Sequence, residues 1–216
     1  MKWTLLFLAM TASAYAAGPL SFGIKAGVPF TDFLNNVSGA SPGGFILNSS
    51  TNRYIVGGTA ELHLPAGLSF EVDALFRHFN YNSSFNLVDV VTNNRASGNA
   101  WEFPLLLKYK FKAPLVRPYI DAGLAFDTLS GLSETVVSTV VPTHITSTSS
   151  NSNPTELKNS TTKGFVLGFG VDIHAIVVHI APEIRYTRWG SSHFTIPNGS
   201  SLSNQNEAEF LIGFTF

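Results

Sequence analysis

EAEFLIGFTF, at residues 207–216, alternates between two kinds of side chain. Phe210, Ile212, Phe214 and Phe216 fall on one face, whereas the other face is mostly polar or small. A period of two predicts a β-strand that is apolar on one side. Because chain termini fray in water, an aromatic face that continues to Phe216 favours a strand that meets lipid. The fold then depends on whether the remaining sequence supplies enough matching strands to close a barrel.

The composition restricts the class of protein. Charged residues make up 12% of the 216 residues, about half the usual share. Beyond the N-terminus no apolar run reaches the roughly 18 residues of a spanning helix, so the polar groups are expected on the inner face of a β-structure. A net charge of -1 gives no indication of a nucleic-acid partner, and the absence of cysteine excludes disulfides, thiol catalysis and cysteine-based zinc sites.

Residues 1–16 have the three parts of a secretory signal peptide. Lys2 supplies the positive charge, residues 3–10 form the apolar core, and Ala14-Tyr15-Ala16 has the form of a cleavage site. We therefore expect export, with cleavage before Ala17. Residues 17–216 are then predicted to form one outer-membrane β-barrel domain.

Seven further segments alternate like the last one, and the connections between the eight are long and short in turn. The expected strands are 21–30, 53–64, 68–81, 100–112, 117–127, 164–174, 177–189 and 207–216; the long loops are 31–52, 82–99, 128–163 and 190–206. Each strand is close to the length that a tilted strand needs to cross a bilayer. The sequence predicts an all-β fold, an eight-stranded antiparallel up-and-down transmembrane β-barrel with long extracellular loops and short periplasmic turns. Pro104 and Pro182 fall inside strands and are interpreted as bulges.

The contents of the two faces favour a barrel with its apolar side outward. Aromatic and aliphatic residues share one face of each strand, and nearly all the charges share the other. Eight strands enclose an interior just wide enough for side chains, which large aromatics from every strand would overfill. We therefore place the charges in the lumen, Trp101 and Tyr186 near the outer rim, and Tyr109 near the inner rim.

The inward charges are of both signs and predict an ion-pair network that plugs the lumen. The expected members are Glu71, Asp73, Arg77, Glu102, Lys108, Arg117, Asp121, Glu183 and Arg185. Such a cluster could instead shift pKa values for acid–base chemistry, which is the enzymatic alternative. We predict a protein that is not an enzyme and has no cofactor.

The histidines and serines offer two other kinds of site. His174 and His179 flank a short turn and could meet, although no metal site is predicted there. A lipid-modifying hydrolase at the outer rim is an alternative function, and no G-x-S-x-G motif is present. Its candidate residues are His78 with Ser83 and Ser84, and His193 with Ser191 and Ser192.

The longest loop, 128–163, is the expected functional surface. It is dense in serine, threonine and asparagine and poor in charge, which suits contact with sugars or with host or neighbouring proteins. Residues 136–141 could extend the barrel wall above the membrane as a hairpin. We expect a structural or surface-interaction role, with a small pore for polar solutes as the alternative.

These features, together with the segments EFPLLLKY at 102–109 and APEIRY at 181–186, resemble those of bacterial outer-membrane β-barrel domain families, including small OmpA/OmpX-like barrels. The resemblance implies an integral outer-membrane protein surrounded by outer-membrane lipid. It also implies that the barrel-assembly machinery reads the last strand through Phe210, Ile212, Phe214 and Phe216. It specifies a fold and a location, and leaves the activity open.

Overall fold

The structure is a computed structural model that describes residues 19–38, 46–51, 53–86, 89–152, 154, 156–175, 178–195 and 202–216. The expected signal peptide lies outside these ranges, as do parts of loops 31–52, 128–163 and 190–206. Within the described ranges, no helix has both the length and the apolar character to cross a membrane.

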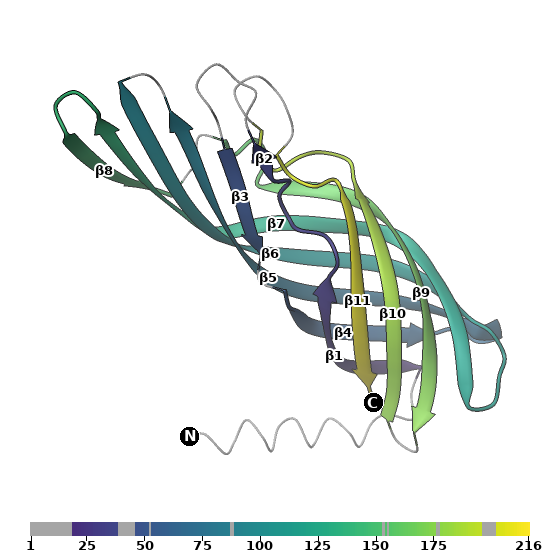
Figure 1. The fold of residues 1–216 in the computed structure, drawn as a ribbon. Helices are drawn as coiled ribbons and strands as arrows, with labels where there is room; N and C mark the ends of the chain where they lie inside the picture. The colour runs from purple at the N-terminus through teal and green to yellow at the C-terminus, as the bar shows by residue number, and fades with distance from the viewer. Residues whose placement is uncertain are drawn as a thin grey trace, which may run out of the picture.

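Eight strands form a closed antiparallel barrel (Figure 1). They are β1 (Leu20–Pro29), β4 (Ile55–His63), β5 (Leu68–Asn86), β6 (Val90–Lys110), β7 (Val116–Val140), β9 (Thr161–Ala175), β10 (Val178–Trp189) and β11 (Asn206–Thr215). Each pairs with the next in this order, and β11 pairs with β1. A three-residue 3₁₀ turn, Pro65–Gly67, joins β4 to β5 at what we call the short-turn end. The predicted fold class is confirmed.

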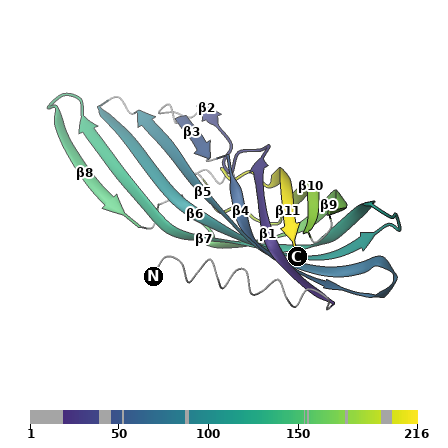
Figure 2. The ribbon, with the colours of Figure 1, turned by 90° about the horizontal axis from the view of Figure 1, so that it is seen from below.

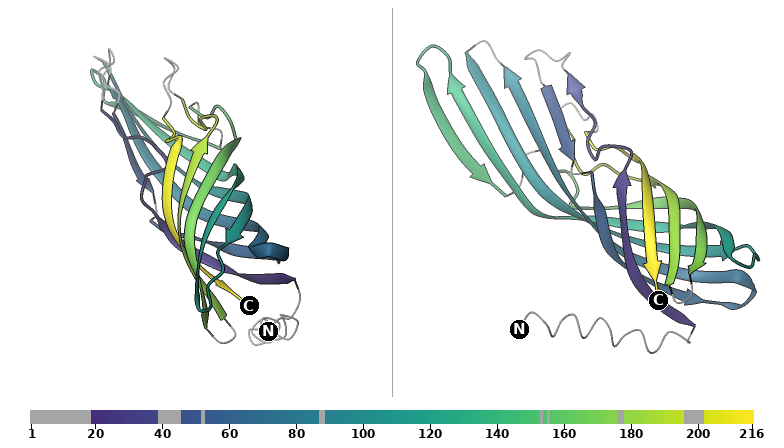
Figure 3. Two further views of the ribbon diagram at one scale, coloured as in Figure 1. Left: turned by 90° about the vertical axis from the view of Figure 1, so that its right-hand side faces the viewer. Right: turned by 60° about the horizontal axis from the view of Figure 1, so that its bottom comes forward.

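Three strands continue beyond the barrel at the opposite, long-loop end. β5, β6 and β7 have 19, 21 and 25 residues, about twice the length needed to cross a bilayer. Their outer parts pair with β3 (Ile46–Thr51) on one side and β8 (Ile145–Asn151) on the other, and β2 (Val37–Ser38) pairs with β3. We call this assembly the projecting sheet. It leans away from β9, β10 and β11, with β8 on its outer side (Figures 2 and 3).

The projecting sheet corrects one expectation and fulfils another. Loop 82–99 was expected from its asparagine and serine content, but most of it is strand, because residues 82–86 pair with 91–95 and residues 90–97 pair with 133–140. Cross-strand pairing outweighs the weak strand preference of these residues. The hairpin expected at 136–141 is present, since β7 runs to Val140 and turns back into β8.

The two faces of the barrel strands are oriented as expected. On β6, Trp101, Phe103 and Leu107 point outward and are 38–54% exposed, whereas Glu102 and Lys108 point inward and are 4% and 2% exposed. An apolar outer surface over a charged interior is the reverse of a soluble barrel and is the arrangement of a barrel in lipid.

The prolines do not form bulges, contrary to the expectation. Pro104 lies opposite Ala125, and Pro182 lies opposite Ile212, in unbroken register. On its other side each strand loses two paired positions at the proline and then resumes in the same register. Because proline lacks an N–H, the ladder is interrupted there without an inserted residue.

A bulge does occur higher up, between β6 and β7. The register shifts between Ser97 and Asn99, where β7 carries one extra residue. Gly131 sits at this point with a φ of 59°, the left-handed conformation that glycine adopts at such bulges. As a result Asp127 and Leu129 are buried below the bulge, at odd positions, whereas Glu134 is buried above it, at an even position.

Candidate functional site: the filled lumen

A buried ion-pair network fills the lower part of the lumen. Lys25 contacts Glu71, Asp73 and Glu183, and Lys108 contacts the second oxygen of Glu71. These five side chains project from β1, β5, β6 and β10 and are each 2% exposed or less. Because charges buried in this way need partners, the interlocked pairs hold several strands together across the lumen.

Arg185 is the other cation of this network, and it is fully buried. Its guanidinium lies 2.9 Å from Asp73 Oδ2 and 2.7 Å from Glu183 Oε1, with Glu71 Oε1 at 3.6 Å. The arginine therefore contacts all three carboxylates that surround Lys25.

A second group of charges lies closer to the long-loop end. Arg77 Nη2 is 2.9 Å from Glu207 Oε2 and 3.4 Å from Asp127 Oδ2. His193 Nε2 lies 3.2 Å from the same Asp127 oxygen, and His193 Nδ1 lies 2.7 Å from the carbonyl oxygen of Asn159. Loop residues are thereby joined to the lumen wall.

The nine residues expected to form one network are thus distributed differently. Glu71, Asp73, Lys108, Glu183 and Arg185 come together, and Arg77 belongs to the second group. The network also includes Lys25, which the sequence places on the inward face without indicating that it contacts three carboxylates.

Three of the nine residues form none of these pairs. Glu102 and Asp121 are buried in the lumen, and both Asp121 oxygens lack a hydrogen-bond partner among the described residues. Arg117 corrects the expectation: it lies at the start of β7, is exposed, and donates to the carbonyl oxygen of Ala113 at 3.1 Å. At the rim, water solvates its charge, so no lumen carboxylate is required.

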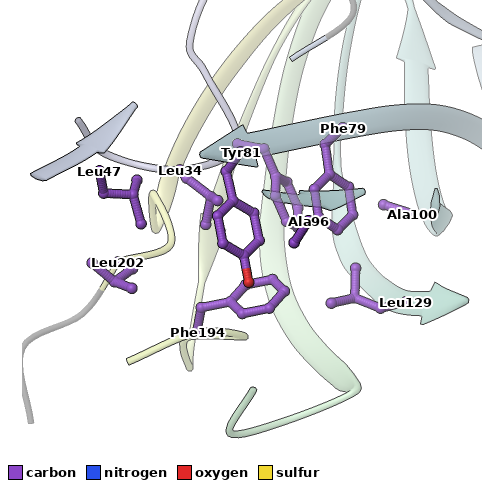
Figure 4. Packing of buried hydrophobic residues seen from close by; sticks show 10 residues of the cluster. Leu34, Leu47, Phe79, Tyr81, Ala96, Ala100, Leu129, Phe194 and Leu202 are labelled. Atoms are coloured by element: carbon purple, nitrogen blue, oxygen red, sulfur yellow. The ribbon is translucent and has the colours of Figure 1, made fainter. Parts of the chain in front are cut away.

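A cluster of buried apolar residues packs at the long-loop end of the barrel (Figure 4). We call it the apolar plug; its members are Phe33, Leu34, Leu47, Phe79, Tyr81, Ala96, Ala100, Leu129, Phe194 and Leu202. The Phe33 and Phe79 rings stack at 4.6 Å, and the Tyr81 and Phe194 rings meet edge-on at 5.6 Å. Such packed aromatic pairs exclude water from the space they fill.

Main-chain hydrogen bonds hold the loop segments of the plug in place. The Leu202 N–H donates to Phe194 O at 3.0 Å, and the Asn204 N–H donates to Phe33 O at 2.9 Å. Leu157 pairs with Phe194 in an isolated bridge. Segments that precede β9, follow β10 and follow β1 are therefore joined over the lumen. Sequence reasoning missed this cluster, because its loop members are isolated apolar residues without periodicity.

Buried acid groups occur where the projecting sheet meets the plug. Burial, reinforced by the charge of Glu156, raises the pKa of Glu134. Burial also raises the pKa of Tyr81 well above its usual range, with the charges of Glu156 and Glu134 adding to the effect. Both groups are thus held more readily in their neutral forms than in water.

Both histidines of the hydrolase alternative have hydrogen-bond partners other than the serines named with them. His78 Nδ1 lies 2.7 Å from Asn99 Oδ1. His193 is buried among lumen and plug residues, and the hydroxyl of Ser192 donates to Phe194 O. The ring nitrogens of His193 lie near Thr162 Oγ1, Asp127 Oδ2 and the carbonyl oxygen of Asn159.

The short-turn end opens into a cavity of about 830 Å³. Lys110 Nζ lies between two carboxylates there, 2.7 Å from Glu61 Oε1 and 3.1 Å from Asp172 Oδ2. His174 and His179 also line the cavity and, as expected, meet across the turn. Along the lumen, this cavity lies at the short-turn end, the buried ion pairs lie inside, and the apolar cluster lies at the long-loop end.

Comparison with known proteins gives a family and a set of distant structural likenesses. A family described as "Outer membrane protein beta-barrel domain" matches residues 11–190. No curated protein matches the chain.

Three solved structures are similar over most of their lengths. The N-terminal β-barrel domain of OprF from Pseudomonas aeruginosa is 13% identical, with a TM-score of 0.42 and coverage of 92% of this chain and 98% of that one. OprG from the same organism is 12% identical, with a TM-score of 0.48 and coverage of 91% and 92%. Ail, the attachment invasion locus protein of Yersinia pestis, is 8% identical, with a TM-score of 0.32 and coverage of 91% and 96%.

The structural likenesses are too distant to support an inference about function. The family match is of a different kind, because it extends from the expected signal segment to β10 and covers every barrel strand except β11. With the closed barrel and its apolar outer surface, this match shows that the chain belongs to the outer membrane protein beta-barrel domain family.

Proposed function

We propose that the protein is a closed, non-conducting outer-membrane barrel that presents the projecting sheet as an interaction surface outside the cell. The single observation that carries this proposal is the apolar plug over a lumen filled with ion pairs. A solute that entered from the long-loop end would have to displace packed aromatic rings and then separate buried ion pairs. Both steps are costly, which argues against the small-pore alternative.

Planar-bilayer recording tests the closed lumen. We expect the purified protein, inserted as a folded barrel, to give no steady ionic current, because the plug and the ion pairs leave no continuous water path. Folding is checked by gel mobility with and without boiling, since closed barrels resist opening by detergent. A stable unitary conductance from protein that passes this check would favour the pore.

The surface proposed for contact is β8 and the outer part of β7, within loop 128–163. All seven residues of β8 are exposed, none is charged, and among the described strands β8 pairs only with β7. Proteins commonly protect edge strands with charges, prolines or bulges. An uncharged outer strand suits an extended segment of a host or neighbouring protein, which would add to the sheet through main-chain hydrogen bonds.

A lysine substituted into β8 tests whether a partner binds by adding a strand to the sheet or in another way. Cells that display the wild-type protein or Ser149→Lys are compared for binding to immobilised extracellular-matrix proteins and to a glycan array. We expect binding to protein that falls at least tenfold in Ser149→Lys, because a charge on the edge opposes pairing. Thr143→Lys, in the turn after β7, serves as the control and should bind normally. Equal loss in both variants, or binding to glycans alone, would contradict the proposal.

We also propose how the chain is exported and then assembled into the outer membrane. The signal peptide at 1–16 would direct secretion, and the barrel-assembly machinery would recognise the last strand. In support, Phe210, Ile212 and Phe214 are on the outward face of β11, and Phe216 is 49% exposed beside them. These side chains are accessible to a protein that approaches from the lipid, and later to outer-membrane lipid itself.

A further inference from the structure

The turn between β9 and β10 brings two histidines together at the short-turn end. His174 and His179 are direct partners in the antiparallel ladder, so their side chains lie on the same face of the sheet. His174 Nδ1 and His179 Nε2 are 3.0 Å apart, and both rings line the cavity.

The ring geometry differs from that of a head-on hydrogen bond. The ring centroids are 4.5 Å apart and the ring planes are inclined by 69°. Two imidazoles that point directly at each other with this nitrogen separation would have centroids about 5.3 Å apart. Two imidazoles on one metal ion, with metal–nitrogen bonds of about 2.05 Å, would have centroids about 4.7 Å apart. The observed separation matches the second arrangement.

Asp172 fixes the protonation pattern that metal binding requires of His179. Its Oδ1 lies 2.8 Å from His179 Nδ1, which assigns the ring proton to Nδ1 and leaves a lone pair on Nε2. Asp172 is itself held in place, being 3% exposed and 3.1 Å from Lys110 Nζ. A carboxylate behind a coordinating histidine is the usual means by which proteins orient such a ligand and strengthen its binding.

The geometry points to a site in which His174 Nδ1 and His179 Nε2 bind one divalent transition-metal ion of tetragonal preference, Cu²⁺ or Ni²⁺. A nitrogen separation of 3.0 Å corresponds to an angle of about 94° at the metal, which suits these ions better than the tetrahedral angle of zinc. No group of three or more histidine, cysteine or acidic side chains is placed to hold a metal within the described ranges. Water therefore completes the coordination, and the cavity has room for it. The site revises the expectation that this turn binds no metal.

Copper titration of the full chain, purified in detergent without a histidine tag, tests the site. We expect one Cu²⁺ per chain by calorimetry, and an electron paramagnetic resonance spectrum with hyperfine splitting from two ring nitrogens. His174→Ala and His179→Ala should each weaken binding at least tenfold and remove one nitrogen from the spectrum. Asp172→Asn should weaken binding about 10- to 100-fold while both nitrogens remain.

The control is His78→Ala, which removes a histidine whose ring contacts Asn99 away from this cavity. It should bind copper as the wild type does, and heat-dependent gel mobility shows whether each variant is folded. Absence of copper binding to the wild type would overturn the proposal. So would undiminished binding to the His174→Ala/His179→Ala double variant. The nitrogen count of the wild-type spectrum decides the question even where a variant does not fold.

Discussion

Replacing Arg185 by methionine is expected to lower the free energy of unfolding by about 3–5 kcal/mol. Methionine fills a similar volume, but the guanidinium that contacts Asp73 and Glu183 is lost, which leaves Lys25 as the remaining cation beside these two carboxylates. Uncompensated charge in a fully buried position is the main cost. Urea titration in detergent, followed by tryptophan fluorescence, measures the change.

Two further variants separate the charge effect from a general loss of packing. Arg117→Met removes an exposed guanidinium whose hydrogen bond is to a carbonyl oxygen, and should change stability by less than about 0.5 kcal/mol. Adding Asp73→Asn to Arg185→Met should recover part of the loss, because one unpaired carboxylate is neutralised. If the double variant is less stable than Arg185→Met, the network does not act through charge balance.

Placing arginine at Leu124 is expected to cost about 2–4 kcal/mol in a lipid bilayer. Leu124 points outward from β7, is 54% exposed, and lies between Leu105 and Phe165 on the neighbouring strands. A charge there meets hydrocarbon with no partner. Reversible unfolding from lipid vesicles gives the value.

The matched control is Ser147→Arg on β8, where all side chains are exposed and the strand lies beyond the barrel. It should leave stability within about 0.5 kcal/mol of the wild type. Equal effects at both positions would show that the Leu124 face is not in contact with lipid.

The sequence predicts the barrel because the barrel depends on local alternation. Every lipid-facing strand repeats its apolar residues at a period of two, and each strand that crosses the membrane was found near its expected position. The prediction failed where a segment has the composition of a loop but forms a strand because neighbouring strands pair with it. Residues 90–99 contain asparagine, serine and glycine, yet form strand because both neighbours are present to pair with them.

The sequence predicts which charged residues of the site point inward, but it does not predict which of them form ion pairs with each other. Alternation places Lys25 and Glu183 on the inward face, whereas their contact depends on the tilt and stagger that bring β1 and β10 across from each other. Arg117 follows the inward alternation of β7, but it lies at the start of the strand and is exposed to water. The plug has no local signal, since Phe33 comes from the loop after β1, whereas Phe194 and Leu202 come from the loop between β10 and β11.

The extra residue at Gly131 shifts the inward–outward alternation of side chains on β7 by one position. The alternation below it and the alternation above it are therefore independent. Residues 116–129 determine which side chains meet lipid, and residues 132–140 determine which face of the projecting sheet is covered. A one-residue insertion or deletion directly after Gly131 would exchange the two faces of the outer part of β7 without moving the lipid-facing side chains of residues 116–129. The barrel can therefore retain its lipid-facing alternation while the projecting sheet varies in length and sequence.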